Sequence, residues 1–180
     1  MADQNYLILV MGVSGCGKST IAQAIAKDLG IENMEADDFH SPEAKARMAS
    51  GTPLNDAWRE PWIASMCNYI ISKPTPKVLA WSGLKRSHRN RFRQLGLPCL
   101  FIHLIGDREV IKKRMEKRQH FMPSSLLNSQ YDELEPSHNE PDILDIEISK
   151  SKQAVQAMAL DKVKEWFNHP PNLLPKDQLH

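Results

Sequence analysis

The apolar residues of this chain fall into short unbroken runs, and stretches with helical periodicity lie between them. Residues 6–11 form the first run, which has no alternation with polar residues. That pattern is typical of a strand buried on both faces. Comparable runs predict further strands at residues 31–36, 78–81, 99–105 and 143–148.

Apolar residues at helical spacing predict helices between these strands. They are expected from residue 21 to Gly30, over residues 58–70 before Pro74, and over residues 155–167. A further helix is expected after Asp107, which would be its N-cap. Parallel neighbours need long crossovers, which helices supply. The alternation of strands and helices along the chain therefore predicts an α/β fold with a mostly five-stranded parallel sheet covered by helices on both faces. Ligands of such sheets bind at the carboxyl ends of the strands.

The 180 residues, 41% hydrophobic and 25% charged, predict one domain over residues 1–168, with a loosely held tail at 169–180. A formal net charge of +1 provides no field that would hold a nucleic acid. The three cysteines, Cys16, Cys67 and Cys99, lack paired or metal-type spacing, so a reducing cytoplasm is expected. The first apolar run is too short for a signal peptide or a membrane span.

The segment after the first strand matches G-x-x-x-x-G-K-[ST], the loop whose backbone N–H groups surround phosphate oxygens. Lys18 is expected to reach the outer phosphates, Ser19 to ligate Mg²⁺, and the following helix to add its positive end. A chance match in a glycine turn is the alternative, but the flanking strand and helix favour the phosphate loop. The predicted ATP-binding residues are Gly12, Val13, Ser14, Gly15, Cys16, Gly17, Lys18, Ser19 and Thr20.

Other residues indicate which nucleotide enzyme this is. The chain has no N-K-x-D and no D-x-x-G, which argues against a GTPase switch, and Asp107 is read as a helix cap rather than a hydrolytic acid. Asp37 and Asp38 follow the second strand, where a carboxylate can accept the proton of an acceptor hydroxyl. An Asx turn, or a cap for the segment near Ser41, is the alternative for this pair.

Eleven of the 23 Lys and Arg residues lie in two segments after the third and fourth strands. A solvated helix face explains Lys112, Lys113 and Lys117. An RNA-binding patch lacks interleaved aromatic residues, so a site for ATP and an anionic substrate is the more economical interpretation of the others. The two sets are Lys85, Arg86, Arg89, Arg91 and Arg93, and Arg108, Lys112, Lys113, Arg114, Lys117 and Arg118.

Taken in order, these segments resemble the gluconate kinases (gluconokinases) of the small phosphate-loop kinase group over about residues 6–148. The resemblance is carried by MGVSGCGKST at residues 11–20, ADDFH at 36–40, KARMASGTPLND at 45–56, REPW at 59–62, WSGLKRSHRNRFR at 81–93 and HFMPSSLLNSQYDELEP at 120–136. The ordered set is far more specific than the phosphate loop alone.

The resemblance implies phosphorylation of D-gluconate by ATP with Mg²⁺, on a fold similar to nucleoside monophosphate kinases with a small lid near residues 118–135. Asp37 would orient or deprotonate the 6-hydroxyl, Lys18 would hold the phosphates, and Arg114 and Arg118 would close over them. The resemblance also suggests a homodimer. The residues implied for binding the sugar acid are Asp37, His40, Arg47, Arg59, Lys85, Arg86 and His120.

Several residues depart from the family pattern. Trp58 stands where an acidic residue is expected, Trp81 and Gly83 replace small Cys and Ala, and Arg47 stands where Lys is common. The segment between Arg118 and His120 is one residue shorter than in the family pattern. These departures leave open a preference for another sugar acid, or an inactive nucleotide-binding regulatory protein. A related kinase of the shikimate or adenylylsulfate type is a third alternative, because it would share the phosphate loop and an acidic residue after the second strand.

Overall fold

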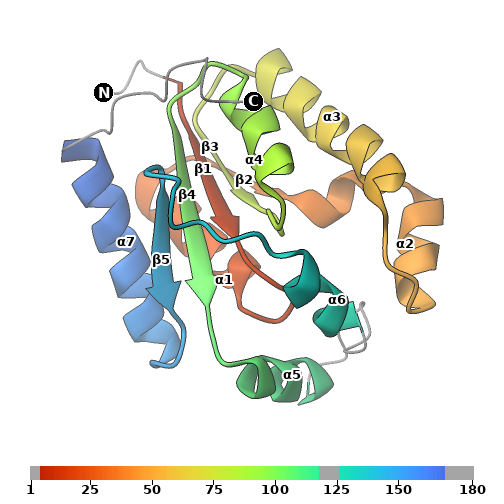
Figure 1. Cartoon of the computed structure of the whole chain (residues 1–180). Helices are drawn as coiled ribbons and strands as arrows, with labels where there is room; N and C mark the ends of the chain where they lie inside the picture. Colours follow the sequence, from red (N-terminus) through yellow and green to blue (C-terminus); the bar gives the residue numbers. More distant parts are fainter. Residues whose placement is uncertain (1–4, 118–125, 169–180) are drawn as a thin grey trace.

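The fold is built on a five-stranded parallel sheet, seen in a computed structural model that describes residues 5–117 and 126–168 (Figure 1). The strand order is β2-β3-β1-β4-β5, and every neighbouring pair is parallel. The predicted sheet is confirmed. The strands are β1 (Leu7–Met11), β2 (Glu32–Glu35), β3 (Lys77–Ala80), β4 (Cys99–Ile105) and β5 (Ile143–Glu147).

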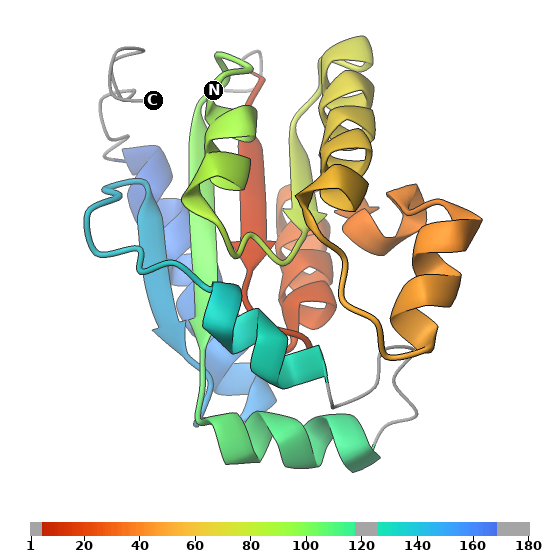
Figure 2. The same ribbon diagram turned by 45° about the vertical axis from the view of Figure 1, so that its right-hand side comes forward.

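Helices cover both faces of this sheet (Figure 2). Ile8 and Val10 of β1 belong to the core that α1 (Lys18–Leu29) and α7 (Lys152–Asn168) close on one face. Leu7, Leu9 and Met11 point to the opposite core, which is covered by α3 (Asp56–Ser72) and by Phe92 of α4 (Arg86–Arg93). All five residues of β1 are buried, because a strand that packs helices on both sides has no solvent-facing side.

Local signals fix the helix ends. Gly30 ends α1 in the left-handed region at φ 65° and donates its N–H to Ala26 O, as expected for a glycine C-cap. Asp107 caps α5 (Arg108–Lys117): its Oδ1 accepts the N–H groups of Glu109 and Val110 at 2.9 and 3.1 Å. The prediction of a helix cap at Asp107 is therefore confirmed.

Three further elements complete the walls around the sheet. A short 3-10 helix (Ala36–Phe39) follows β2, and α2 (Pro42–Ala49) comes next, with Ser41 Oγ accepting the Ala44 N–H at 3.1 Å. Helix α6 (Leu126–Glu133) lies between α5 and β5 along the chain. Ser41, not Asp37 or Asp38, thus provides the side-chain cap of α2.

The sheet order places the phosphate loop at a favourable position. Strand β1 lies between β3 and β4, so the chain moves to opposite sides of β1 as the sheet is completed. Ligands of open α/β sheets bind at the carboxyl ends of strands beside such a switch point. Among the helices of the described ranges, none is long and apolar enough to cross a membrane.

Candidate active site

A pocket opens at the carboxyl ends of β1, β2 and β3. The phosphate loop forms one wall, the 3-10 helix and α3 form the wall facing it, and residues of α5 and α6 complete the rim. The lining residues are Ser14, Gly15, Gly17, Lys18, Ser19, Thr20, Glu35, Ala36, Asp37, His40, Met48, Pro53, Leu54, Arg59, Trp62, Ala80, Trp81, Ser82, Arg114, Met115, Leu126 and Ser129.

The tight packing of the phosphate loop requires glycine at two positions. Gly12 has φ 141°, and a Cβ there would lie 2.8 Å from the backbone oxygen of Leu104. Gly15 has φ 81°, and its Cβ would lie 2.5 Å from Met115 Cγ. Both the dihedral angles and the lack of space exclude a side chain. The loop therefore packs directly against β4 at Gly12 and against α5 at Gly15.

The groups at the start of α1 fit a bound polyphosphate. Gly17 precedes the helix without a side-chain cap, so the first-turn N–H groups have no side-chain acceptor from that residue. Lys18 and the exposed Ser19 stand in the same turn, beside the positive end of the helix dipole. Lys18 Nζ donates to Val13 O at 3.0 Å, and Ser19 Oγ donates to Glu35 Oε2 at 2.8 Å. Backbone donors, a cation and a hydroxyl thus lie together at the start of α1, where an anion would be favoured.

Asp37 provides the carboxylate on the wall facing this loop. Its side chain is 63% exposed, and its Oδ1 lies 4.0 Å from His40 Nε2. The His40 ring stacks on Trp62 with a centroid distance of 4.1 Å, and Trp62 Nε1 donates to Ala36 O at 2.7 Å. The indole therefore fixes both the histidine ring and the backbone from which Asp37 projects.

His40 is neutral at physiological pH. Burial disfavours the imidazolium and, with the positive charges of Lys45 and Arg59, lowers the pKa of His40 to about 4, although Asp37 acts in the opposite direction. A neutral imidazole can both donate and accept hydrogen bonds. His40 therefore contributes hydrogen bonding, not charge, to the pocket.

The structure separates the predicted site residues into groups. Gly12, Val13 and Cys16 shape the loop without lining the pocket, while Asp38 lies on the same 3-10 helix as Asp37 but outside the lining. Arg118 and His120 lie outside the described residues. The predicted residues that do line the pocket are Ser14, Gly15, Gly17, Lys18, Ser19, Thr20, Asp37, His40, Arg59 and Arg114.

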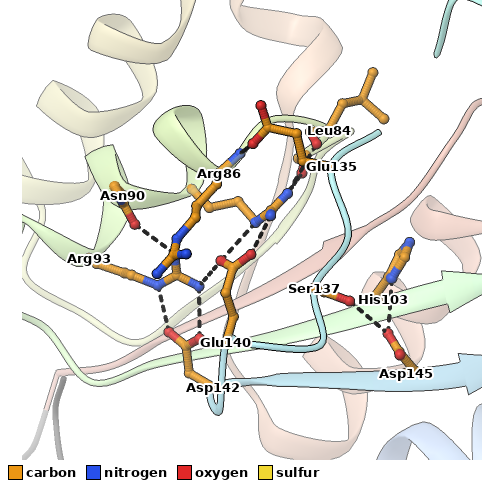
Figure 3. A network of polar contacts seen from close by, with 12 residues as sticks. Leu84, Arg86, Asn90, Arg93, His103, Glu135, Ser137, Glu140, Asp142 and Asp145 are labelled. Carbon is orange, nitrogen blue, oxygen red and sulfur yellow. Dashed lines mark hydrogen bonds and ion pairs between the residues drawn. The ribbon is translucent and has the colours of Figure 1, made fainter. Parts of the chain in front are cut away.

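Arg47, Lys85 and Arg86 do not line this pocket. The Arg47 guanidinium lies 5.6 Å from the centroid of the Trp58 ring, so the unexpected tryptophan contacts a predicted substrate-binding arginine. Lys85 Nζ lies 2.8 Å from both carboxylate oxygens of Asp56. The backbone N–H of Arg86 donates to Glu135 Oε2 at 2.6 Å (Figure 3).

The interpretation of the first basic cluster as an anion site is wrong for its buried members. Arg89 and Arg93 do not line the pocket, and both belong to an ion-pair network with Glu140 and Asp142. Figure 3 shows Arg93 directed at the two carboxylates. Burial raises the pKa of Glu140, but hydrogen bonds and charges of the two arginines outweigh it and lower that pKa overall. Arg91 pairs with Glu60. A cation buried in α4 needs a carboxylate partner, and the 140–142 segment provides two.

Several polar or aromatic groups at the pocket were not predicted from the sequence as site residues, among them Glu35, Trp62 and Ser82 of the lining and Gln130, which contacts the loop. Glu35 carried a signal, since it is acidic and ends the second strand two residues before Asp37. Trp62 is predicted to lie on a buried helix face and belongs to the REPW segment, but neither gives it a role in the site. Gln130, whose Oε1 accepts the Ser14 N–H at 2.6 Å, lies 116 residues from its partner, and no local pattern links the two.

The sheet order, the phosphate loop beside β1 and the carboxylate facing it define a P-loop kinase that uses ATP. Residues 7–140 match the protein family described as an AAA domain. A probable gluconokinase of Xenopus tropicalis is 36% identical over 80% of this chain and 86% of its own length. A gluconokinase of Gluconobacter oxydans is 40% identical over 74% of this chain and 78% of its own.

A solved structure gives the same result. The crystal structure of a gluconokinase from Sinorhizobium meliloti superposes with a TM-score of 0.82 at 35% identity, covering 92% of this chain and 98% of that one. This chain belongs to the gluconokinase family. The expected resemblance and the expected fold class are both confirmed.

Proposed function

We propose that this protein transfers the γ-phosphoryl group of ATP to the 6-hydroxyl of D-gluconate, releasing ADP and 6-phosphogluconate. The names of its relatives support the acceptor. One observation in the structure carries the chemistry: Asp37 and the phosphate loop line the same pocket, whereas Asp38 does not. Transfer to an alcohol requires such a carboxylate facing a phosphate site.

In this proposal Asp37 orients the 6-hydroxyl and accepts its proton as the oxygen attacks the γ-phosphorus, and the bond to the β-phosphate oxygen breaks. Lys18 neutralises charge on the transferring group, and Arg114 adds a second cation from α5. Both cations line the pocket with Asp37. The pocket therefore brings a base and two cations to one site.

Mg²⁺, when bound, would supply positive charge that offsets the charge of the phosphates. Ser19 is the residue that would hold it, because its hydroxyl is exposed at the start of α1 and already contacts the Glu35 carboxylate. Within residues 5–117 and 126–168, no group of three or more His, Cys, Asp or Glu side chains forms a metal site of its own.

The sugar acid would lie on the wall formed by His40 and Arg59. Arg59 lines the pocket, and its side chain is 12% exposed. Its Nη2 lies 2.6 Å from Oε2 of Glu133 on α6, and this ion pair orients the guanidinium. Neutral His40 suits a polyol hydroxyl. Arg47, Lys85, Arg86, Arg118 and His120 remain predicted substrate or lid residues.

The decisive experiment is a coupled assay of ADP release with gluconate, shikimate, glycerate and nucleoside monophosphates as acceptors. Turnover with gluconate, and a primary phosphate ester in the ³¹P spectrum of the product, is the expected result. Turnover only with another acceptor would assign a related kinase. ATP binding without turnover on any acceptor would favour the inactive nucleotide-binding protein.

The same proposal includes a cytoplasmic location and, from the family resemblance, a homodimer. The buried free thiols of Cys16, Cys67 and Cys99 suit a reducing compartment. Light scattering across a concentration series measures the mass, and a mass of one chain throughout would contradict the dimer.

A further inference from the structure

The peptide group that joins Val13 to Ser14 in the phosphate loop is held at both of its polar ends. Its carbonyl oxygen accepts a hydrogen bond from Lys18 Nζ at 3.0 Å. Its N–H donates to Gln130 Oε1 at 2.6 Å. The phosphate-binding lysine and a glutamine of α6 therefore contact opposite ends of one planar unit.

The direction of this peptide is set by the two torsions beside it, ψ of Val13 and φ of Ser14. Among the backbone contacts of the described residues, the carbonyl oxygen accepts only one further hydrogen bond, a long one of 3.4 Å from the Cys16 N–H. Rotation of the peptide would turn the carbonyl oxygen away from Lys18 Nζ. The hydrogen bond to Gln130 opposes that rotation from the other end of the same plane.

Gln130 is well placed to act as a fixed acceptor. Its side chain is buried at 9% exposure, and α6 also has anchors outside the phosphate loop. Tyr131 Oη donates to Gly106 O at 3.3 Å, and the Arg108 guanidinium lies 4.8 Å from the centroid of the Tyr131 ring. Beyond the helix, the Glu135 N–H donates to Leu84 O at 2.8 Å.

We infer that Gln130 is a positioning residue that holds the Val13–Ser14 peptide and thereby sets the direction of the Lys18 ammonium. It does not contact the substrate in this role. The inference rests on the proposed use of ATP but not on the identity of the acceptor. A failure of the gluconate assay therefore leaves it intact, and it is tested by nucleotide binding alone.

The test is a double-mutant cycle on the dissociation constant of Mg²⁺ and the nonhydrolysable analogue AMP-PNP, measured by calorimetry. Gln130→Met keeps the length of the side chain and removes the acceptor. In the Lys18 protein it is expected to weaken binding about three- to tenfold, the worth of one hydrogen bond. In the Lys18→Ala background the same change is expected to have less than about a twofold effect, because the group that it positions is gone.

Tyr131→Phe is the matched control, since it removes a different anchor of the same helix. Its dissociation constant is expected to stay within about twofold of the parent. Equal losses from Gln130→Met in both lysine backgrounds would show a purely structural role and overturn the inference. So would an equal loss from Tyr131→Phe, or no loss from Gln130→Met. If thermal denaturation shows that Gln130→Met does not fold, Gln130→Ala replaces it in the same cycle with the same expected outcomes.

Discussion

The hydroxyl of Ser19 at the start of α1 donates a hydrogen bond of 2.8 Å to Glu35 Oε2 at the end of β2. This contact joins the phosphate loop to the strand that leads into Asp37. It also places a carboxylate beside the hydroxyl proposed as the Mg²⁺ ligand. Glu35 is further held by Asn33 Nδ2 at 3.4 Å.

Glu35→Gln is therefore expected to raise the Mg²⁺ concentration needed for half-maximal activity about tenfold, the usual cost of losing a group that orients a metal ligand. The amide keeps the size of the side chain but lacks the charge that favours a cation. A magnesium titration at saturating ATP measures the effect. Glu32→Gln, at the opposite end of β2, is the control, and its half-saturation should match the parent. An unchanged titration for Glu35→Gln would show that Glu35 does not contribute to Mg²⁺ binding.

Asp37→Asn is expected to lower kcat about 10²-fold or more, because the amide cannot accept the proton of the acceptor hydroxyl. Asp38→Asn is the matched control: it lies on the same 3-10 helix, carries the same charge and does not line the pocket. Its kcat is expected to stay within about threefold of the parent. Steady-state kinetics on gluconate compare the two. Equal effects at both positions would rule out a specific role for Asp37.

The low pKa of His40 predicts that acid destabilises the fold. An unfolded histidine titrates near 6.5 and folded His40 near 4, so the unfolded state binds more protons between these values. Stability is therefore complete above about pH 6.5 and falls as the pH drops to about 4. Burial also lowers the pKa of His88 and His103, so both contribute to the same loss of stability in acid.

His40→Gln is expected to reduce the loss of stability between pH 7 and pH 4.5, as measured by urea denaturation at both values. The exposed His138 provides the control, since His138→Gln should leave that difference unchanged. A parent-like difference for His40→Gln would show that His40 is not buried in its neutral form.

Glu140→Gln is expected to destabilise the fold by about 3–5 kcal/mol, because it leaves the fully buried guanidinium of Arg89 without its carboxylate. Glu60→Gln removes the partner of Arg91, where both side chains are exposed by 41% and 50%, and is expected to cost about 0–1 kcal/mol. Chemical denaturation gives both values. Similar costs for the two changes would mean that burial does not decide the importance of these pairs.

Much of this protein follows from local sequence. The unbroken apolar run at β1 requires that both faces of the strand are covered, and the helical stretches between the strands provide the cover. Gly30 and Asp107 mark helix ends through their own backbone and side-chain chemistry. The phosphate loop is equally local, since its donors, glycines and Lys18 lie within nine residues. The ordered motifs indicated the gluconokinase family for the same reason.

Tertiary structure alone decided how side chains from distant segments are used. Arg89 and Lys85 are both cations after β3, but one is buried against Glu140 and the other contacts Asp56. Asp37 and Asp38 are adjacent in sequence, and the turn of the 3-10 helix brings only Asp37 into the pocket. Such choices depend on long-range contacts, like that of Gln130 with Ser14, which no local pattern of residues encodes.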